Sequence, residues 1–287
     1  MTQTEFIDMW DTVLRGCSYV DYQGVGIYTL PAFSVFTGLK HGFSARTGGV
    51  SVGEFASLNL SFSRETPCEN VMQNYRIFCD AVGIDKDSMV MDNFAHGTTV
   101  QRVNKTDAGR GYTRAPLPSC DALITDDPSI TLLTGHADCM AIYMYDPVRR
   151  CIGLAHAGWR GALHRIGMHV VSAMQDAYST QPTDLCVGIG PSICPNCFEV
   201  DSDVAEAFTA AFPGTPCVRA STEPGKYTVD LWMVAFRQLI DEGVCADRIS
   251  LMNVCTYEDE RLYSYRRDRG RTGGMAAFLA LCTSVAG

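Results

Sequence analysis

Cys139 and His156 flank an expected β-hairpin whose geometry would bring their side chains together. The composition of residues 146–149, which include Asp and Pro, is typical of a four-residue turn. Such a turn places Tyr145 opposite Arg150, and because paired positions keep a constant sum, Cys139 then lies opposite His156. Opposed residues have Cβ atoms about 4.5–5.5 Å apart. That separation suits two ligands of one metal ion, or a thiolate and an imidazolium.

The surroundings of His156 favour a functional role, although both residues also have simpler interpretations. Ala155, Ala157 and Gly158 leave room beside His156 for a ligand, and the helix expected just beyond favours negative charge. Taken separately, Cys139 fits an ordinary buried thiol and His156 a hydrogen-bonded turn histidine. The expected pairing of the two favours the functional interpretation.

Four further segments carry weaker signals. His96 is followed by a glycine and a β-rich run, and by itself it is typical of a solvent-facing turn. Cys194 and Cys197 have the spacing of a redox motif, but they lie among turn residues and have no second pair at structural-zinc spacing. Residues 265–269 form a basic cluster suited to a phosphate or carboxylate, or else a solvated turn. Residues 24–26 lack the third glycine of a dinucleotide fingerprint, and no Walker lysine motif occurs.

The elements that must position these residues alternate between helical and β patterns. Helical spacing of apolar residues predicts helices at 70–83, after Gly161, at 201–212, at 229–242 and at 274–282. Short β-rich runs lie at 98–103, 130–133, 140–145, 151–155, 185–189, 248–255 and 261–265. Several strand pairs are hairpin-spaced, which predicts an α/β (α+β) fold with mixed β-sheet layers covered by helices. No repeat or linker divides the chain, so we expect residues 1–287 to form one domain.

Composition limits the classes of partner. The chain has 287 residues, of which 46% are apolar, and its longest uncharged apolar stretches are only strand-length, so we expect no integral membrane protein. The net charge is −9 and no run of Lys or Arg exceeds a pair, so nucleic acid is not an expected partner. Thirteen irregularly spaced cysteines and the lack of an apolar leader in residues 1–10 predict a reduced, cytoplasmic protein.

Five motifs follow one another between about residue 40 and about residue 278. They are Ser44-Ala45-Arg46-Thr47-Gly48-Gly49-Val50-Ser51 with Ser57-Leu58-Asn59-Leu60, Ala137-Asp138-Cys139, His156-Ala157-Gly158-Trp159-Arg160-Gly161, Gly190-Pro191-Ser192-Ile193, and Ser264-Tyr265-Arg266-Arg267-Asp268. Through them the chain resembles the laccase-domain family, also called multicopper polyphenol oxidase or purine nucleoside phosphorylase-like proteins, some bacterial members of which are described as peptidoglycan editing factors. The resemblance implies a fold similar to that of the cytotoxic necrotizing factor-like cysteine hydrolases.

The resemblance also implies a metal centre. In such proteins the histidine of a His-Gly motif, the cysteine of Ala-Asp-Cys and the histidine of His-Ala-Gly-Trp-Arg-Gly bind zinc, and they match His96, Cys139 and His156. Three protein ligands leave a fourth position open, as in catalytic zinc sites. The chain departs from the family pattern at Phe94-Ala95, where Gln-Val is usual, and at Gly274, where Arg is usual. Both departures spare the ligands and concern possible substrate contacts.

Family members are similar in acting on purine nucleosides. The resemblance thus implies zinc-dependent phosphorolysis of adenosine, inosine or methylthioadenosine and deamination of adenosine, with nucleoside and phosphate as partners. We expect Arg46, Asn59 and Arg160 to bind the substrates, the two arginines being candidates for an anion site. Asp138 is expected to steer a proton or orient a ligand. The expected catalytic residues are Cys139, His156 and Asp138.

Three alternatives remain open. In a metal-free cysteine hydrolase, Cys139 would be the nucleophile and His156 the base. Copper is a possible occupant of a site with two histidines and one cysteine. True laccase chemistry, however, needs many more imidazoles than the six histidines of the chain, three of which are already assigned. The third alternative is a partner-binding or peptidoglycan-precursor editing role.

Overall fold

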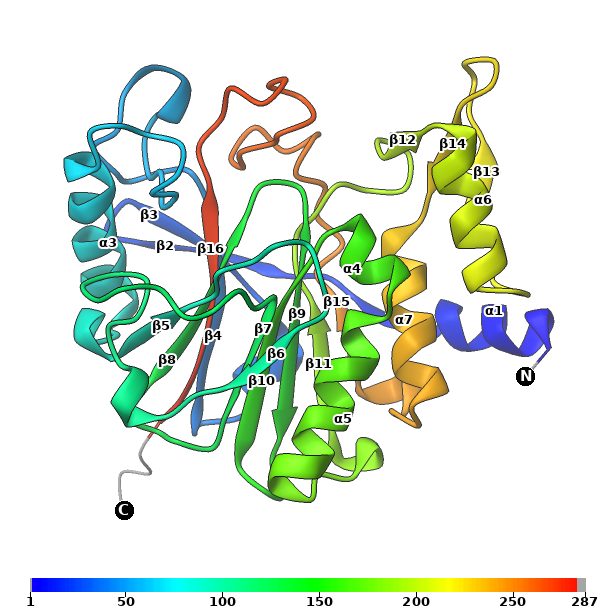
Figure 1. Ribbon diagram of the computed structural model, residues 1–287, viewed down its shortest axis with the longest axis horizontal. Coiled ribbons are helices and arrows are strands. Elements are labelled where there is room, and N and C mark those ends of the chain that lie inside the picture. The colour runs from blue at the N-terminus through cyan, green and yellow to red at the C-terminus, as the bar shows by residue number, and fades with distance from the viewer. Residues whose placement is uncertain (1, 283–287) are drawn as a thin grey trace.

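The computed structural model describes residues 2–282, in which two β-sheets lie face to face between layers of helices (Figure 1). Three groups of buried apolar side chains separate the layers. One group fills the space between the sheets, and a second packs α3 (Glu69–Val82) against the six-stranded sheet. A third packs α5 (Ile166–Tyr178) and α7 (Leu231–Asp241) against the seven-stranded sheet. The expected α/β architecture of mixed sheets covered by helices is confirmed.

The two large sheets differ in their strand directions. The six-stranded sheet, in the order β2-β3-β4-β16-β8-β5, is antiparallel except for the β5–β8 pair. Its strands are β2 (Ser18–Tyr22), β3 (Val25–Thr29), β4 (Leu39–Ser44), β5 (Met89–Met91), β8 (Thr131–His136) and β16 (Met275–Leu281). The seven-stranded sheet, in the order β1-β15-β11-β9-β10-β7-β6, is antiparallel only among β11, β9, β10 and β7. Its strands are β1 (Leu14–Arg15), β6 (Val100–Arg102), β7 (Ala122–Thr125), β9 (Met140–Asp146), β10 (Cys151–Ala157), β11 (Cys186–Ile189) and β15 (Ile249–Leu251).

The helices follow the apolar spacing of the sequence. In α3, Val71, Tyr75 and Phe78 form one buried face, and Gly83 ends the helix with a left-handed φ of 66°. The helix expected after Gly161 is two helices, because Arg165 adopts a left-handed φ of 61° between α4 and α5. The remaining helices are α1 (Gln3–Asp11), α2 (Pro31–Ser34), α4 (Trp159–Leu163) and α6 (Ser202–Ala211), and a small sheet joins β12 (Glu199–Val200), β14 (Tyr227–Val229) and β13 (Val218–Ala220).

The helix expected at 274–282 is wrong, because the segment forms strand β16. This strand lies between β4 and β8 at the centre of its sheet, and all of its residues are buried. Met275 and Ala277 face the core between the sheets, whereas Ala276 and Phe278 face α3. A run that is apolar at every position fits a helix as well as a strand buried on both faces, and here the neighbouring strands decide.

Two segments expected to be strands are mostly loop. Of residues 248–255 only β15 forms a strand, although Cys255 makes an isolated bridge to Ser192, and residues 261–265 contain no strand. Leu262 is fully buried, as an inward strand residue would be, but its backbone N–H donates to the carbonyl oxygen of Asp259 within a turn. The strand expected at 261–265 is therefore wrong, because a folded loop buries its apolar side chains.

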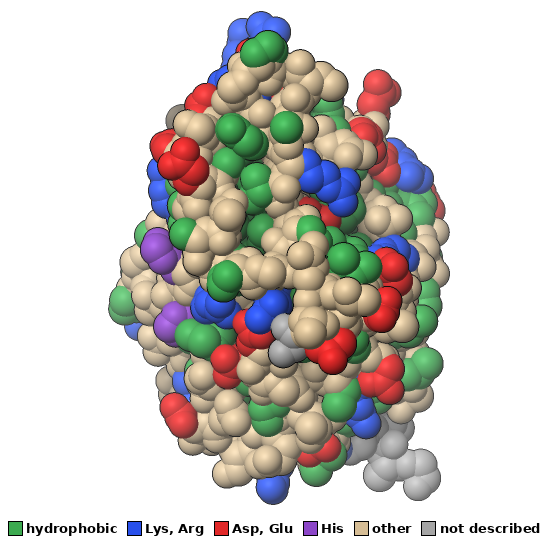
Figure 2. All heavy atoms as spheres, turned by 90° about the vertical axis from the view of Figure 1, so that its right-hand side faces the viewer, with side chains coloured by type: hydrophobic (Ala, Val, Ile, Leu, Met, Phe, Trp, Pro, Cys, Tyr) green, Lys and Arg blue, Asp and Glu red, His purple; other side chains and the backbone are tan. Residues whose placement is uncertain are grey.

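The surface has no concentrated basic patch on the face that carries α1, α6 and α7. Figure 2 shows acidic and basic side chains interspersed there. Within residues 2–282, no helix combines the length and the apolar character needed to cross a membrane.

Candidate metal centre and active-site cavity

The turn between β9 and β10 lies one residue later than expected. Asp146 pairs with Cys151, so the turn comprises residues 147–150. The Asp146 carboxylate explains this shift, because its Oδ1 accepts hydrogen bonds from the backbone N–H groups of Val148 and Arg149 at 2.8 and 2.9 Å and closes the turn. Each residue of β9 consequently pairs two positions farther along β10 than the sequence predicts.

The observed register still brings Cys139 and His156 together. His156 pairs with Ala141, and the same register places Cys139 opposite Gly158. The expected direct pairing of Cys139 with His156 is therefore wrong by two positions. Because side chains on a strand alternate with a period of two, the two side chains still point to the same side of the hairpin.

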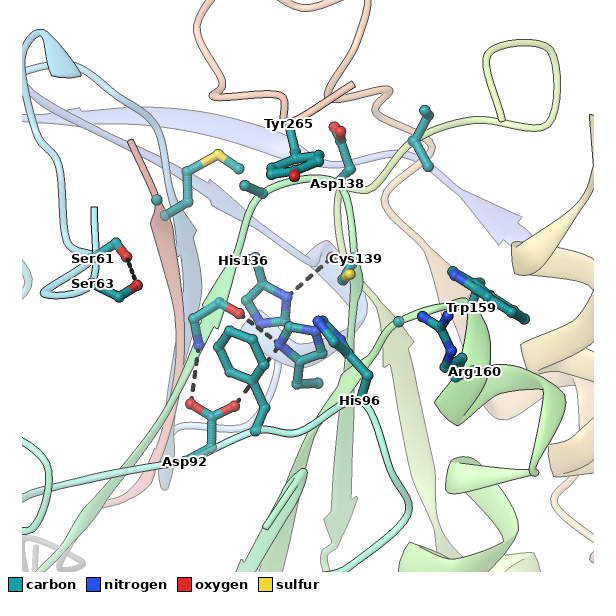
Figure 3. A pocket seen from close by; sticks show the side chains of 18 of the residues that line it. Ser61, Ser63, Asp92, His96, His136, Asp138, Cys139, Trp159, Arg160 and Tyr265 are labelled. Atoms are coloured by element: carbon teal, nitrogen blue, oxygen red, sulfur yellow. Dashed lines mark hydrogen bonds and ion pairs between the residues drawn. The ribbon is translucent and has the colours of Figure 1, made fainter. Parts of the chain in front are cut away.

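Gly158 leaves open the space in which three side chains meet. A Cβ atom on Gly158 would lie 2.9 Å from His96 Nδ1, 3.2 Å from Cys139 Sγ and 3.7 Å from His156 Nε2. The ligand atoms of these three residues lie within 4.8 Å of one another. His96 reaches this point from the loop between β5 and β6, where it adopts a left-handed φ of 59°. The structure thus places together the three residues expected to bind metal; Figure 3 shows two of them, His96 and Cys139, beside the cavity.

His156 presents an unprotonated nitrogen to this space. Its Nδ1 lies 2.8 Å from the carbonyl oxygen of Gly135, which can only accept, so Nδ1 carries the hydrogen. Within residues 2–282, no group forms a hydrogen bond with the buried Nε2. The buried Asp92 carboxylate lies 3.9 Å from Nδ1 on the same side, and burial raises the pKa of Asp92 well above its usual range. A buried nitrogen without a partner costs free energy, and a metal ion bound to Nε2 would remove that cost. A carbonyl partner on the other nitrogen is usual for a metal-ligating histidine.

Burial controls the protonation of two of the three side chains. Desolvation lowers the pKa of His156 well below its usual range and keeps the imidazole neutral. Desolvation, with a smaller contribution from the Asp138 carboxylate, raises the pKa of Cys139 to about 12. A divalent cation would reverse the effect on Cys139, because it stabilises the thiolate directly. Two imidazoles and one thiolate are a ligand set that fits zinc, and three protein ligands would leave one position free on a four-coordinate ion.

Aromatic rings hold the His156 imidazole in place. The His136 ring stacks on it with a centroid distance of 5.1 Å, and the Phe94 ring does so at 4.1 Å. Both nitrogens of His136 are occupied, by Thr134 Oγ1 at 2.7 Å and by the Cys139 carbonyl oxygen at 3.0 Å. Burial lowers the pKa of His136 to about 3, so this ring stays neutral. The sequence gives no signal for His136, because it has no recognisable spacing to the other histidines.

The three ligand atoms lie at the wall of a cavity of about 860 Å³. This volume is within the range of about 300–1,000 Å³ typical of small-molecule sites. Several loops at one end of the two sheets form its walls (Figure 3). Its lining includes Leu60, Phe62, Arg64, Phe94, Trp159, Arg160, Ile193, Tyr265, Arg266 and Met275.

Three arginines line this cavity. Arg64 is half-buried and lies 5.2 Å from the ring centroid of Tyr265, and burial lowers the pKa of its guanidinium below the ordinary value. Arg160 stacks 4.2 Å over the ring of Trp159. Arg160 is one of the expected substrate contacts, and Arg266 belongs to the basic cluster of the sequence. Arg64 lies outside every recognised motif, and only its closeness to the Ser-Leu-Asn-Leu motif could have suggested it.

Arg46 and Asn59, the other expected substrate contacts, do not line the cavity. Arg46 Nε donates to the carbonyl oxygen of Ala56 at 2.7 Å. Asn59 is fully buried, and its Oδ1 accepts hydrogen bonds from the backbone N–H groups of Ser61 and Gly274 at 3.0 and 2.9 Å. Asn59 thus holds Ser61 and Gly274 at the wall of the cavity, whereas Arg46 bonds to a backbone carbonyl outside the lining.

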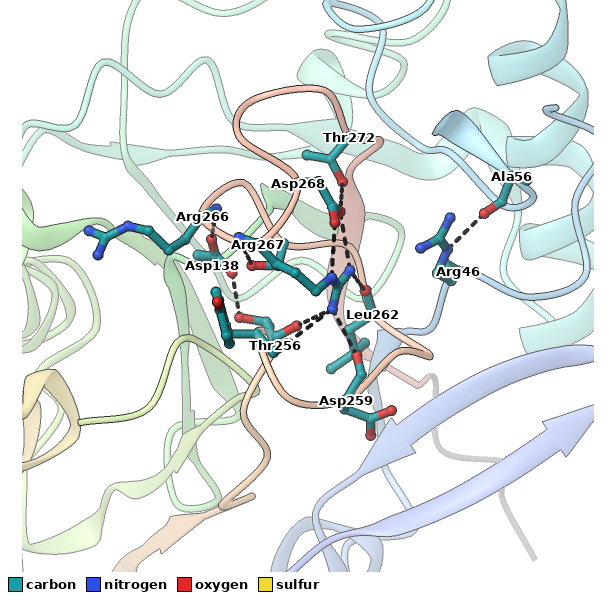
Figure 4. Close-up of polar contacts among 12 residues, drawn as sticks. Arg46, Ala56, Asp138, Thr256, Asp259, Leu262, Arg266, Arg267, Asp268 and Thr272 are labelled. Atoms are coloured by element: carbon teal, nitrogen blue, oxygen red, sulfur yellow. Dashed lines mark hydrogen bonds and ion pairs between the residues drawn. The ribbon is translucent and has the colours of Figure 1, made fainter. Parts of the chain in front are cut away.

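Asp138 is tied to the loop that precedes β16 (Figure 4). One carboxylate oxygen accepts a hydrogen bond from Thr256 Oγ1 at 2.6 Å, and the other accepts from the backbone N–H of Arg266 at 2.7 Å. In the same loop, Arg267 donates to the carbonyl oxygens of Thr256 and Leu262 at 3.0 and 2.7 Å. These bonds make Asp138 a positioning residue for the loop that carries the neighbouring cysteine.

The departure from the family pattern at Gly274 has a local structural counterpart. A Cβ atom at this position would lie 2.7 Å from Ser61 Cβ, so the absent side chain lets the loop around Ser61 pack closely. Arg64 Nη1 lies 3.4 Å from the carbonyl oxygens of Gly270 and Thr272, in the loop that leads to Gly274. The cavity therefore keeps a guanidinium beside the loop in which the family's usual arginine is missing.

The fold and the site define an α/β protein in which two histidines and one cysteine lie at metal-ligand distances from one another at the wall of a cavity. The chain belongs to the family described as multi-copper polyphenol oxidoreductase laccase, whose model matches residues 40–282. The resemblance inferred from the sequence motifs is confirmed.

Relatives of the chain share both its sequence and its fold. It is 36% identical to the purine nucleoside phosphorylase YlmD of Geobacillus stearothermophilus over 248 residues, which are 85% of this chain and 90% of that protein. It is 30% identical to the purine nucleoside phosphorylase LACC1 of Homo sapiens over 250 residues, which are 84% of this chain and 55% of that protein. The crystal structure of YlmD from Geobacillus stearothermophilus matches with a TM-score of 0.86 at 34% identity, covering 92% of this chain and 98% of that one.

Proposed function

We propose that this protein is a zinc-dependent purine nucleoside phosphorylase that cleaves adenosine, inosine or methylthioadenosine and also deaminates adenosine. The observation that carries the proposal is the convergence of His96 Nδ1, Cys139 Sγ and the unpaired His156 Nε2 at the wall of a nucleoside-sized cavity. The names of the relatives support the substrate class. Zinc bound to these residues would supply a Lewis acid at this wall.

The cavity offers side chains suited to a base and to an anion. Phe94 and Tyr265, which are 42% and 54% exposed, supply aromatic faces on which a purine can stack. Arg64, Arg160 and Arg266 supply guanidinium groups that match a phosphate. We assign phosphate binding to these three arginines, because Arg46 lies outside the cavity.

The proposed phosphorolysis displaces the base from the ribose. A phosphate oxygen forms a bond to C1′ while the bond from C1′ to N9 breaks, and the base leaves with the electron pair and takes up the proton that the hydrogen phosphate gives up. The arginines orient the phosphate and offset its negative charge. Asp138 acts through the loop contacts that hold the position of Cys139. In deamination, water adds at C6 of adenine and ammonia leaves.

Two rival chemistries are less well supported by the site. A metal-free cysteine hydrolase needs a thiolate and an imidazolium, but burial disfavours charge on both Cys139 and His156. A laccase needs further copper ligands, yet His41 accepts a hydrogen bond from the backbone of Leu30 and His136 is fully bonded. A role in editing peptidoglycan precursors differs from the proposed function in its substrate, so a comparison of substrates distinguishes the two.

A nucleoside panel with and without phosphate tests the proposed function. Protein of measured zinc content is incubated with adenosine, inosine and methylthioadenosine, and the free bases, the sugar 1-phosphates and ammonia are quantified. We expect base release that requires phosphate, ceases after chelation and returns with zinc. Activity that persists in the chelated protein would establish the thiolate mechanism instead, and turnover of a muropeptide precursor without nucleoside turnover would establish the editing role.

Replacing Arg64 tests the proposed anion site. Arg64→Gln removes a half-buried charge that faces the cavity, and a charge-assisted hydrogen bond contributes about 1.5–3 kcal/mol. We expect the KM for phosphate to rise about 10- to 100-fold, with a smaller change in the KM for inosine. Arg76→Gln, on the exposed side of α3, is the matched control and should leave both constants unchanged. An unchanged KM for phosphate in Arg64→Gln would remove Arg64 from the anion site.

A further inference from the structure

A second group of metal-ligating side chains lies beyond the ends of β11 and β15. Cys194, Cys197, Cys255 and Glu258 offer four ligand atoms that lie within 4.8 Å of one another. The two strands are adjacent and parallel, so the loops that follow them leave the sheet at the same edge. Each loop supplies two of the residues with the same spacing, Cys194-x-x-Cys197 and Cys255-x-x-Glu258. The sequence shows the first pair, but only the fold places the second pair beside it.

Two sulfur–oxygen distances in this cluster match those of a tetrahedral metal site. Glu258 Oε1 lies 3.7 Å from Cys194 Sγ and 3.4 Å from Cys197 Sγ. With a zinc–sulfur bond of about 2.3 Å and a zinc–oxygen bond of about 2.0 Å, tetrahedral geometry separates a sulfur and an oxygen ligand by about 3.5 Å. The backbone N–H of Cys194 donates a hydrogen bond to Cys255 Sγ at 3.3 Å, and such a bond stabilises a thiolate at this position.

We propose that Cys194, Cys197, Cys255 and Glu258 bind a second zinc ion, which has a structural role. Four protein ligands complete a tetrahedron and leave no position for substrate, unlike the centre at His96. Cys194 and Cys255 are buried, Cys197 is half-buried and Glu258 is exposed, so the ion would be accessible from the side of Glu258.

A cation explains this cluster better than a redox-active dithiol. A carboxylate next to the sulfur atoms of Cys194 and Cys197 repels the thiolate on which disulfide exchange depends. A divalent cation converts the same carboxylate into a favourable partner.

The second ion would brace the loops behind the active-site cavity. Thr256, which follows Cys255, donates its hydroxyl to the Asp138 carboxylate, and the backbone N–H of Ile193 donates to the Asp138 carbonyl oxygen at 3.0 Å. Both loops of the cluster therefore contact the residue that precedes Cys139. Zinc at the cluster would hold these contacts in place without touching the substrate.

Metal counting in single-site variants tests the proposal, whatever reaction the protein catalyses. Proteins purified in zinc and a thiol reductant, then freed of loose metal by gel filtration, are analysed by mass spectrometry for metal per chain. We expect two zinc ions in the wild type, one in Cys139→Ala, one in Cys197→Ser and two in Cys245→Ser, a matched half-buried cysteine outside both clusters. One ion in the wild type together with none in Cys139→Ala would overturn the proposal.

Cobalt substitution identifies which cluster holds each ion. Co²⁺ bound to three thiolates absorbs more strongly in the near ultraviolet than Co²⁺ bound to one, so Cys139→Ala should retain most of this charge-transfer band and Cys197→Ser should lose most of it. Glu258→Ala changes an exposed residue and should keep the fold but release its second ion to a chelator at least tenfold faster than the wild type. A disulfide between Cys194 and either Cys197 or Cys255 in the reductant-treated protein would contradict the proposal.

Discussion

Cys139→Ala is expected to lower kcat/KM for phosphate-dependent base release from inosine by about 10³-fold, because it removes the only thiolate from the centre that His96 and His156 complete. Loss of a metal's charge stabilisation costs several kcal/mol in the transition state, and each 1.36 kcal/mol corresponds to a factor of ten in rate. The measurement is steady-state kinetics on protein whose zinc content has been determined. Zinc content should fall together with activity.

The matched control for this prediction is Cys151→Ala. Cys151 is buried in the same hairpin, but at the turn end, where its Sγ contacts Thr180 rather than the cavity. Its replacement should lower the free energy of unfolding by about 1 kcal/mol and leave kcat/KM within twofold. If Cys139→Ala loses zinc yet retains wild-type phosphorolysis, the metal centre is not the site of the proposed reaction.

The sequence correctly predicts that Cys139 and His156 share one face of the hairpin, but its predicted register is wrong. The turn is displaced by one residue because the Asp146 carboxylate accepts hydrogen bonds from the turn's backbone. Residue preferences alone do not predict which of the two turn positions forms. The resulting change of two in pairing returns Cys139 and His156 to the same face, because the pleat repeats every two residues. His96, by contrast, comes from a loop with a left-handed backbone, and only the family resemblance identifies it.

The motifs do not say which way a side chain faces: of the residues expected at the substrate, Arg160 lines the cavity, whereas Arg46 and Asn59 do not. Asn59 is expected at the substrate, but its side-chain oxygen accepts hydrogen bonds from the backbone N–H groups of Ser61 and Gly274. Arg64 belongs to no motif, yet the loop that Asn59 holds carries it into the cavity. β16 illustrates the same limit for the fold, since a strand buried on both faces has no periodicity that excludes a helix.

Gly158→Ala is expected to weaken zinc binding by about 100-fold while leaving the fold intact. Gly158 has a φ of −69° and a ψ of 169°, which alanine adopts without strain. The added methyl group, however, would lie 2.9 Å from His96 Nδ1 and 3.2 Å from Cys139 Sγ, so it occupies the space in which the ligands meet. Mutations that disturb the orientation of metal ligands typically cost about 10- to 100-fold in metal affinity. Competition with a chromogenic zinc chelator measures the change.

The stability of the metal-free protein distinguishes this steric effect from general damage. Replacing Gly by Ala at a permitted backbone conformation reduces the entropy of the unfolded chain and stabilises a protein by about 0.4–1 kcal/mol. Metal-free Gly158→Ala should therefore unfold at the same or a slightly higher denaturant concentration than the metal-free wild type, although added zinc stabilises it less. Gly38→Ala, whose nearest neighbour atom would be 3.9 Å away, is the control and should keep full zinc affinity. Wild-type zinc affinity in Gly158→Ala would mean that His96 and Cys139 do not meet at one ion, because the methyl group would then stand between them.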